Sequence, residues 1–118
     1  SEVELGPLDA VRDYVDVRDV ATAVHGLATA EGLAHRVYNV GTGRPTLVRT
    51  LVRMIADRVG FSGTIRESGP ASPRSSGMRF QVAGIDRIRS TGWAPAVPFP
   101  ESIDALVASV DEPMELGR

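Results

Sequence analysis

Residues 6–23 read GPLDAVRDYVDVRDVATA, and this stretch decides most of what the chain can fold into. A glycine-proline turn leads into Arg12 and Asp13, and an alternating apolar run follows. Residues 17–30 then predict a helix whose buried face comprises Val20, Ala23, Val24, Leu27 and Ala28. Asp16 is the predicted N-cap, and Asp19 places a negative charge in the first turn. So much charge around buried valines indicates the edge of a binding site built on a core helix.

The segments after this helix predict a strand, a turn and a second helix. Residues 36–40, RVYNV, are β-branched and aromatic and predict a strand. A Gly-Thr-Gly turn follows at residues 41–43. Residues 47–59 predict the second helix, with Thr46 as its N-cap and Gly60 at its end.

The remainder of the chain predicts shorter elements around one long loop. Residues 64–67 and 78–83 have extended character, and residues 68–77, SGPASPRSSG, form the loop between them. A short helical segment is expected within 85–90 and a last helix at 101–110. The pattern predicts an α/β fold, a small mixed lobe of three main helices and several short strands.

Composition restricts the function classes. A length of 118 residues predicts a single domain that is long enough to bury a real core. The net charge of −2 gives no electrostatic basis for binding nucleic acid or an anionic membrane. No apolar run is long enough to span a bilayer, and the absence of cysteine fits a reducing cytoplasm. The opening residues SEVEL are more typical of the middle of a longer protein than of a natural start.

Lysine is absent, and all 13 basic residues are arginines. Within these residues, this excludes Schiff-base chemistry, a phosphate-loop lysine and a Tyr–Lys proton-transfer pair. A genome rich in G and C would explain the bias, but the chemical exclusion holds in either case.

Other chemical motifs are weak. The GTG turn between a strand and a helix suggests a phosphate loop, but the third glycine and the later acidic residue of a dinucleotide site are missing. A structural turn is the favoured interpretation. His25 and His35 have no neighbouring ligand at metal-binding spacing, which favours surface histidines.

Two arginines, Arg12 and Arg74, are the candidate ligand-binding residues. Each lies beside turn residues, and a guanidinium offers a planar set of donors suited to phosphate oxygens. On composition alone, two solvated or ion-paired arginines remain the simpler interpretation.

Four motifs together resemble a known family. They are RDYVDVRDVA at 12–21, VYNVGTG at 37–43, GWAP at 92–95 and FPESI at 99–103. In order and spacing they resemble the carboxyl-terminal part of extended short-chain dehydrogenases/reductases, the NAD(P)-dependent nucleotide-sugar epimerases, dehydratases and reductases. The resemblance covers about residues 3 to 110. Residues 6–13, GPLDAVRD, further resemble GDP-mannose 4,6-dehydratases and GDP-4-keto-6-deoxymannose reductases, although Pro7 stands where those enzymes have asparagine.

The resemblance implies a domain organisation and site residues. Residues 1–110 correspond to the substrate-binding lobe of a Rossmann-type enzyme, 111–118 to a flexible tail, and the NAD(P)-binding Rossmann half is absent. Arg12 and Arg74 take the positions that bind the nucleotide diphosphate, whereas Gly77 and Gly84 replace acidic residues of the family. The resemblance gives structural positions to Asp13, Tyr14, Asp19, Asn39, Gly41, Gly43 and Trp93. Asn39 is expected to bond to backbone and Asp19 to cap its helix.

The implied partner is a nucleotide-diphosphate sugar, with GDP-sugars favoured. The glycine-rich GxxGxxG and the YxxxK pair are not in the sequence, so these residues alone are expected to bind no NAD(P), to carry no catalytic residue and to be inactive. A non-catalytic binding or interaction module and an inactive remnant are the alternatives. Apolar surface left by a missing Rossmann half would favour self-association.

Overall fold

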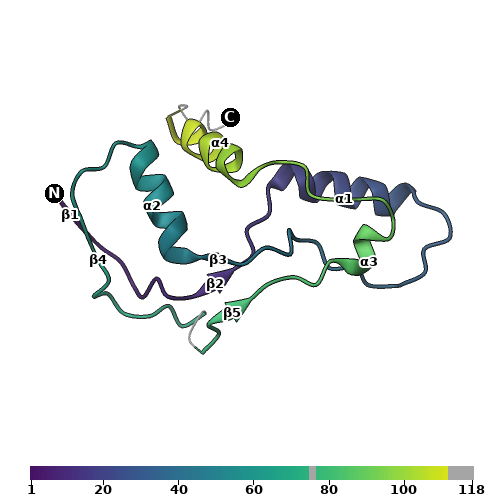
Figure 1. Ribbon diagram of the computed structural model, residues 1–118, viewed down its shortest axis with the longest axis horizontal. Helices are drawn as coiled ribbons and strands as arrows, with labels where there is room; N and C mark the ends of the chain where they lie inside the picture. Colours follow the sequence, from purple (N-terminus) through teal and green to yellow (C-terminus); the bar gives the residue numbers. More distant parts are fainter. Residues whose placement is uncertain (75–76, 112–118) are drawn as a thin grey trace, which may run out of the picture.

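The computed structural model describes residues 1–74 and 77–111, and it confirms the predicted α/β class. The elements are, in order, β1 (Glu2–Glu4), β2 (Val11–Arg12), α1 (Val17–Thr29), β3 (Thr46–Leu47), α2 (Val48–Arg58), β4 (Thr64–Arg66), β5 (Phe80–Gln81), α3 (Asp86–Arg89) and α4 (Phe99–Asp111). The molecule is elongated, 55 × 40 × 28 Å, with α1 and α3 at one end and β1, β4 and α2 at the other (Figure 1). Beyond Asp111, the tail predicted from the sequence lies outside the described residues. None of the described helices is long and apolar enough to cross a membrane.

Two small sheets join segments that are far apart in the sequence. β1 pairs with β4 in parallel, with Glu2 opposite Thr64. β2 is the central strand of the second sheet, antiparallel to β3 and parallel to β5. Arg12 therefore lies between Thr46 on one side and Gln81 on the other. This sheet fixes the backbone of Arg12, the residue to which the sequence assigns ligand binding.

Helix α1 forms where the periodicity predicts it, but it buries a narrower stripe than predicted. The Asp16 carboxylate accepts a hydrogen bond of 2.8 Å from the Arg18 amide, which confirms the predicted N-cap. The buried residues of α1 are Asp19 and Ala23, whereas Val24 is 59% exposed. The predicted face was therefore wrong at Val24, and Ala28 is exposed as well. The face of α1 that carries Asp19 is the buried one, because the Asp19 carboxylate accepts hydrogen bonds from the amides of Ala96 and Val97.

The second helix begins one residue later than predicted, and Thr46 is not its cap. Leu47 occupies the N-cap position without a side-chain hydrogen bond. Thr46 instead belongs to β3, where it pairs with Arg12. Thr46 thus pairs in a strand, whereas the local sequence pattern assigned it to the helix as its cap. Gly60 has a φ of 67° and follows the end of α2 as predicted.

The strand predicted at 36–40 is wrong. This segment has no strand assignment, and it pairs with no strand in the described part of the chain. Tyr38 and Val40 still pack against the core, while Val37 is 65% exposed and Asn39 is exposed, so the side chains alternate as they would in a strand. The segment therefore has the alternation of a strand but no neighbouring strand to pair with.

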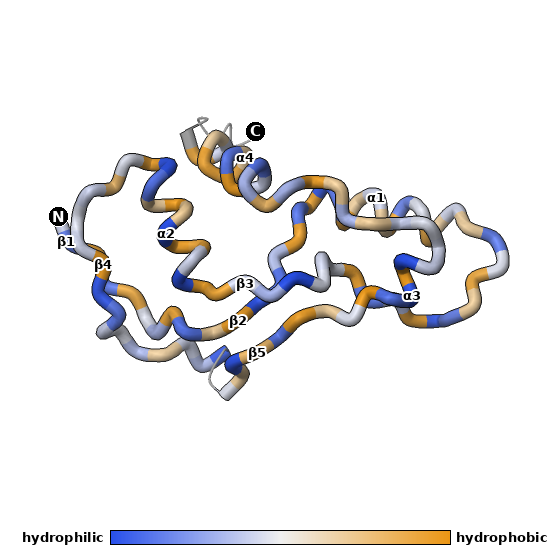
Figure 2. Tube along the Cα trace, in the orientation of Figure 1, coloured by the Kyte–Doolittle hydropathy of each residue, from blue (hydrophilic) through white to orange (hydrophobic). Residues whose placement is uncertain are grey.

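Helices α2 and α4 lie against each other at the end of the molecule that holds the first sheet. Arg58 Nε donates to Asp104 Oδ1 at 2.7 Å, and Ile103 of α4 is buried. Figure 2 shows hydrophobic and hydrophilic residues interleaved along both helices, as expected for helices with one covered face.

The expectation of a real core is not met. The buried apolar residues of the described chain are Leu8, Ala23, Ile85, Ile88 and Ile103. The radius of gyration is 17.3 Å, whereas a compact domain of this length would have about 13.5 Å. The residues fold around a small nucleus and leave many apolar side chains exposed.

Candidate functional site

The site begins with Asp13, the residue immediately after strand β2. Its carboxylate accepts hydrogen bonds from the Thr42 amide (3.0 Å), the Thr42 hydroxyl (2.5 Å), the Gly43 amide (2.9 Å) and the Ala83 amide (3.3 Å). It therefore joins three segments, which come from residues 11–13, 41–43 and 82–84. The Gly-Thr-Gly turn is an anion-binding loop whose anion belongs to the protein itself.

Hydrogen bonding keeps this carboxylate ionised. Burial raises the pKa of Asp13, but the bonds from Thr42, Gly43 and Ala83 outweigh it and hold the pKa below its ordinary value. The loop amides that a phosphate group would need are already occupied. The described residues therefore do not fit a dinucleotide at this loop, in agreement with the structural interpretation of the GTG turn.

Glycine at position 41 is required by the closeness of Asp13. A Cβ atom added to Gly41 would lie 2.6 Å from Asp13 Oδ2 and 2.7 Å from Ala83 Cβ. At Gly43 the backbone has a φ of 70°, which favours glycine. The two glycines thus let the loop wrap around the carboxylate.

Arg12 lines a cavity of about 620 Å³. The walls come from residues 12–13, from residues 38–40, which precede the Gly-Thr-Gly turn, and from residues 81–84. The guanidinium donates from Nη1 to its neighbouring carbonyl, Val11 O (2.9 Å), and from Nη2 to Met78 O (2.7 Å). Both acceptors are neutral carbonyls, so the positive charge of Arg12 is oriented but not neutralised by them.

Arg74 lies on the long loop and is exposed. It forms no ion pair with a residue that the structure describes. Loop residues on both sides of it, Ser72 and Gly77, line a second cavity of about 540 Å³, which Met78 also lines. Met78, which accepts a hydrogen bond from Arg12, lines this second cavity, but Arg12 itself lines only the first, and Arg74 lines neither. The structure brings the loop to Arg12 without bringing the two guanidinium groups into one cavity.

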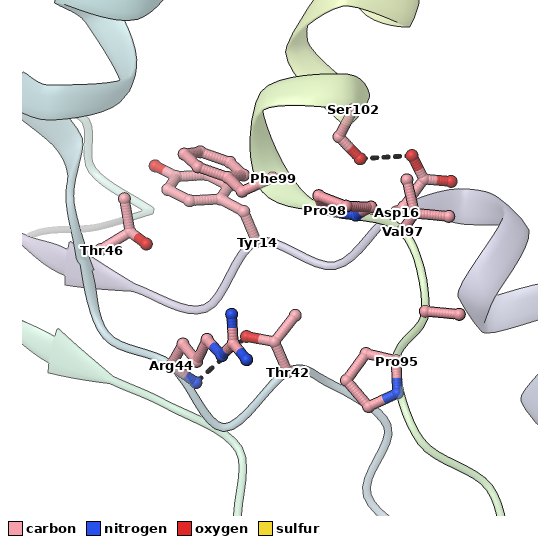
Figure 3. A pocket seen from close by; sticks show the side chains of 11 residues that line it. Tyr14, Asp16, Thr42, Arg44, Thr46, Pro95, Val97, Pro98, Phe99 and Ser102 are labelled. Carbon is pink, nitrogen blue, oxygen red and sulfur yellow. Dashed lines mark hydrogen bonds between the residues drawn. The ribbon is translucent and has the colours of Figure 1, made fainter.

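A third, smaller pocket of about 210 Å³ lies near Tyr14 (Figure 3). The rings of Tyr14 and Phe99 stack with centroids 6.0 Å apart, and Figure 3 places Thr42 and Arg44 across the pocket from them. Burial raises the pKa of the Tyr14 phenol, which the charge of Arg12 partly opposes. Tyr14 remains a neutral packing residue rather than an acid or base at neutral pH.

Three further predicted structural residues have separate outcomes. Asp19 was expected to cap α1, but it does not. Its carboxylate is 3% exposed and accepts hydrogen bonds from the amides of Ala96 (3.0 Å) and Val97 (3.1 Å). Trp93 packs against the core, and its indole donates to the Thr22 hydroxyl at 3.0 Å. Asn39 was expected to bond to backbone, but it is exposed and its amide has no hydrogen bond to a described residue.

Sequence reasoning missed the partners of the predicted residues. Thr42 and Ala83 hold Asp13, and Met78 holds Arg12. Thr42 and Asp13 are residue types that can form a hydrogen bond, but no local pattern connects positions 29 residues apart. Ala83 and Met78 contribute backbone atoms, and contacts of backbone atoms cannot be predicted from the type of residue. His25 and His35 are exposed, as predicted.

Comparison with known proteins now gives the family. The model of the "NAD dependent epimerase/dehydratase family" matches residues 1–41. A dTDP-6-deoxy-L-talose 4-dehydrogenase (NAD(P)(+)) of Kitasatospora kifunensis is 33% identical over 107 residues, which is 90% of this chain. The chain belongs to this epimerase/dehydratase family. The resemblance to extended short-chain dehydrogenases/reductases is thereby confirmed.

Two other relatives also match the epimerase/dehydratase chain over most of its length. A GDP-6-deoxy-D-mannose reductase of Pseudomonas aeruginosa is 29% identical over 108 residues, 92% of this chain. The structure of a UDP-glucose 4-epimerase of Thermotoga maritima with UDP-glucose matches with a TM-score of 0.77 and 28% identity over 92% of this chain. The chain spans about a third of the length of these relatives: 35% of the reductase, 33% of the dehydrogenase and 34% of the epimerase.

Proposed function

We propose that these residues form the substrate-binding lobe of an NAD(P)-dependent nucleotide-sugar epimerase, dehydratase or reductase, and that the lobe binds the nucleotide diphosphate. The names of the three relatives include GDP, dTDP and UDP sugars. The bases and sugars of these compounds differ, whereas the diphosphate is common to all. A lobe related to all three is suited to recognising the diphosphate.

The observation that carries the proposal is the state of Arg12. Arg12 lines the cavity of about 620 Å³, and the two hydrogen bonds of its guanidinium go to neutral carbonyls. A guanidinium has five N–H donors, so donors remain for phosphate oxygens. The charge is held in one orientation before a ligand arrives, which lowers the entropic cost of binding.

Arg74 supplies the second cation of the proposed diphosphate clamp. It is exposed on a loop that follows Gly69, whose amide donates to Leu5 O at 2.9 Å. This bond fixes the start of the loop beside Leu5, in the segment between β1 and β2. Ser72 and Gly77, on either side of Arg74 in the loop, line the second cavity, and a rotation of side chain or loop is needed to bring Arg74 to a ligand held by Arg12.

Redox chemistry is assigned to residues outside these 118. The GTG loop holds Asp13 instead of a phosphate, and the sequence has no lysine to pair with a tyrosine. NAD(P) would supply hydride transfer in the whole enzyme. In this proposal the lobe binds and orients the substrate, and no step of the reaction is carried by its own side chains.

Titration calorimetry with GDP, UDP and dTDP, performed on the whole gene product, tests the proposal. Arg12→Ala and Arg74→Ala are each expected to weaken binding about 10- to 100-fold, the loss typical of a charge-assisted hydrogen bond. Arg53→Ala, an exposed arginine of α2, is the matched control and should leave the affinity unchanged. The resemblance of GPLDAVRD favours GDP as the tightest ligand.

Other outcomes separate the competing functions. If Arg44→Ala weakens binding and Arg12→Ala does not, the ligand occupies the pocket near Tyr14 and the clamp is refuted. Nucleotide binding without turnover of any nucleotide sugar would favour a non-catalytic binding module. No heat with any nucleotide would favour an inactive remnant.

A further inference from the structure

We infer that Asp13 is a positioning residue for the proposed diphosphate site: it orients Arg12 by tying together the three walls of the cavity. The inference rests on the proposed function. Arg12 is the last residue of β2 and Asp13 follows it, and both residues line the cavity of about 620 Å³. The Asp13 carboxylate is bound by the GTG loop, whereas the Arg12 guanidinium is bound by the carbonyls of Val11 and Met78.

The contacts of Asp13 match the walls of the cavity one by one. The cavity of about 620 Å³ is lined by residues of the segments 12–13, 38–40 and 81–84. Asp13 itself is in the first, its bonds to Thr42 and Gly43 hold the end of the second, and its bond to Ala83 holds the third. Removal of the carboxylate would release the GTG loop from the other two walls, which the pairing of Arg12 with Gln81 still joins.

The hydrogen bonds of Asp13 reduce the effect that its negative charge would have on a diphosphate site. An unshielded carboxylate next to Arg12 would neutralise the arginine or repel a phosphate. The Asp13 carboxylate points instead into N–H and O–H dipoles of Thr42, Gly43 and Ala83. Those dipoles offset its negative charge, so Arg12 keeps its attraction for an anion.

The structure also offers a matched comparison. Asp19 is a second carboxylate held by backbone amides, those of Ala96 and Val97, and it is more deeply buried than Asp13. It belongs to α1 and lines neither the cavity of Arg12 nor the one beside the long loop. Asp19→Asn and Asp13→Asn therefore remove the same chemical group from two different places.

A double-mutant cycle on the whole gene product, with GDP and guanosine as titrants, tests the inference. Asp13→Asn is expected to weaken GDP binding at least 10-fold and guanosine binding by less than 2-fold, while Asp19→Asn changes neither. The variant Arg12→Ala with Asp13→Asn should bind GDP no more weakly than Arg12→Ala alone, because Asp13 acts through Arg12. Full additivity of the two losses would overturn the inference, as would wild-type affinity in Asp13→Asn.

A ligand-free readout keeps this result separate from the proposed function. Exchange of the Arg12 guanidinium protons, followed by NMR without nucleotide, should be accelerated several-fold by Asp13→Asn and unchanged by Asp19→Asn. If the wild-type protein binds no nucleotide, the proposed function falls, and this exchange alone decides whether Asp13 orients Arg12. Unchanged exchange in Asp13→Asn would refute the inference even if GDP binds.

Discussion

Gly41 shows how closely the residues around Asp13 are packed. No side-chain atom fits between the loop and the carboxylate, because a Cβ would come within 2.6 Å of Asp13 Oδ2 and 2.7 Å of Ala83 Cβ. Neither neighbour is the free end of a flexible side chain. Asp13 is held by its hydrogen bonds, and Ala83 belongs to the backbone segment that donates to it.

Gly41→Ala is therefore expected to destabilise the protein by about 1–3 kcal/mol, the usual cost of forcing an extra methyl group into a packed site. Gly26→Ala is the control of opposite sign. Gly26 lies within α1, where an added Cβ meets nothing within 4 Å, so alanine should stabilise by about 0.5–1 kcal/mol. Urea denaturation of both variants measures the difference. Equal midpoints for the two would contradict the packing described here.

The start of α1 is held to α4 by a single carboxylate. Asp16 caps α1 through the Arg18 amide, forms an ion pair with Arg18 Nε at 2.9 Å and accepts a short hydrogen bond from the Ser102 hydroxyl of α4. Hydrogen bonds from Arg18 and Ser102 lower the pKa of Asp16 well below its ordinary value. The ionised form is therefore the one that the folded protein prefers.

The lowered pKa of Asp16 determines how the stability of the protein changes with pH. A carboxyl group whose pKa is lower in the folded state stabilises the protein above its unfolded value of 3.8, and the contribution is lost as the pH falls below that value. Asp16→Ala should cost about 1 kcal/mol at neutral pH through the lost cap. Asp16→Asn keeps a good cap, so it should cost less at neutral pH and lose less stability than the wild type between pH 6 and 3. Thermal unfolding across that range measures both, and a slope identical to the wild type in Asp16→Asn would contradict the assignment.

What could be predicted from the sequence depended on how local the determinant is. The helix at 17–29 followed from its periodicity and the Asp16 cap, which lie within a few residues of each other. The strand at 36–40 did not form because a strand needs a neighbour, and none of the described strands reaches Val37. Arg12 was found as a candidate, but its orientation depends on Met78, 66 positions later. The clamp of Asp13 likewise joins residues that no local pattern connects.

The whole molecule exposes more apolar surface than a stable domain usually does. Val17 is 77% exposed, Val24 59% and Val37 65%, while five apolar residues are buried among those that the structure describes. Burial of each such valine would contribute about 1.5–3 kcal/mol. Relatives about three times as long supply further chain that would cover such a surface. The predicted self-association has the same physical basis.

The 118 residues expressed alone are therefore expected to self-associate at micromolar concentration. Val24→Lys combined with Val37→Lys should reduce the association, since charge is costly to bury without a partner. Val59→Lys is the control, because Val59 is also exposed but lies after α2, at the opposite end of the molecule from α1 (Figure 1). Sedimentation velocity distinguishes the variants. A clean monomer at high concentration would exclude self-association.

The parallel pairing of β1 with β4 and of β2 with β5 has a consequence for synthesis on the ribosome. The paired residues are about 60 to 70 positions apart in the chain. At ordinary translation rates of about 5–20 residues per second, each early strand waits roughly 3 to 14 s for its partner to emerge. During this interval β1 has no partner for Val3, and β2 can pair only with β3, through Val11 and Leu47, so its other edge stays open. Nascent chains of this protein should therefore require a holding chaperone for longer than chains whose strands form hairpins.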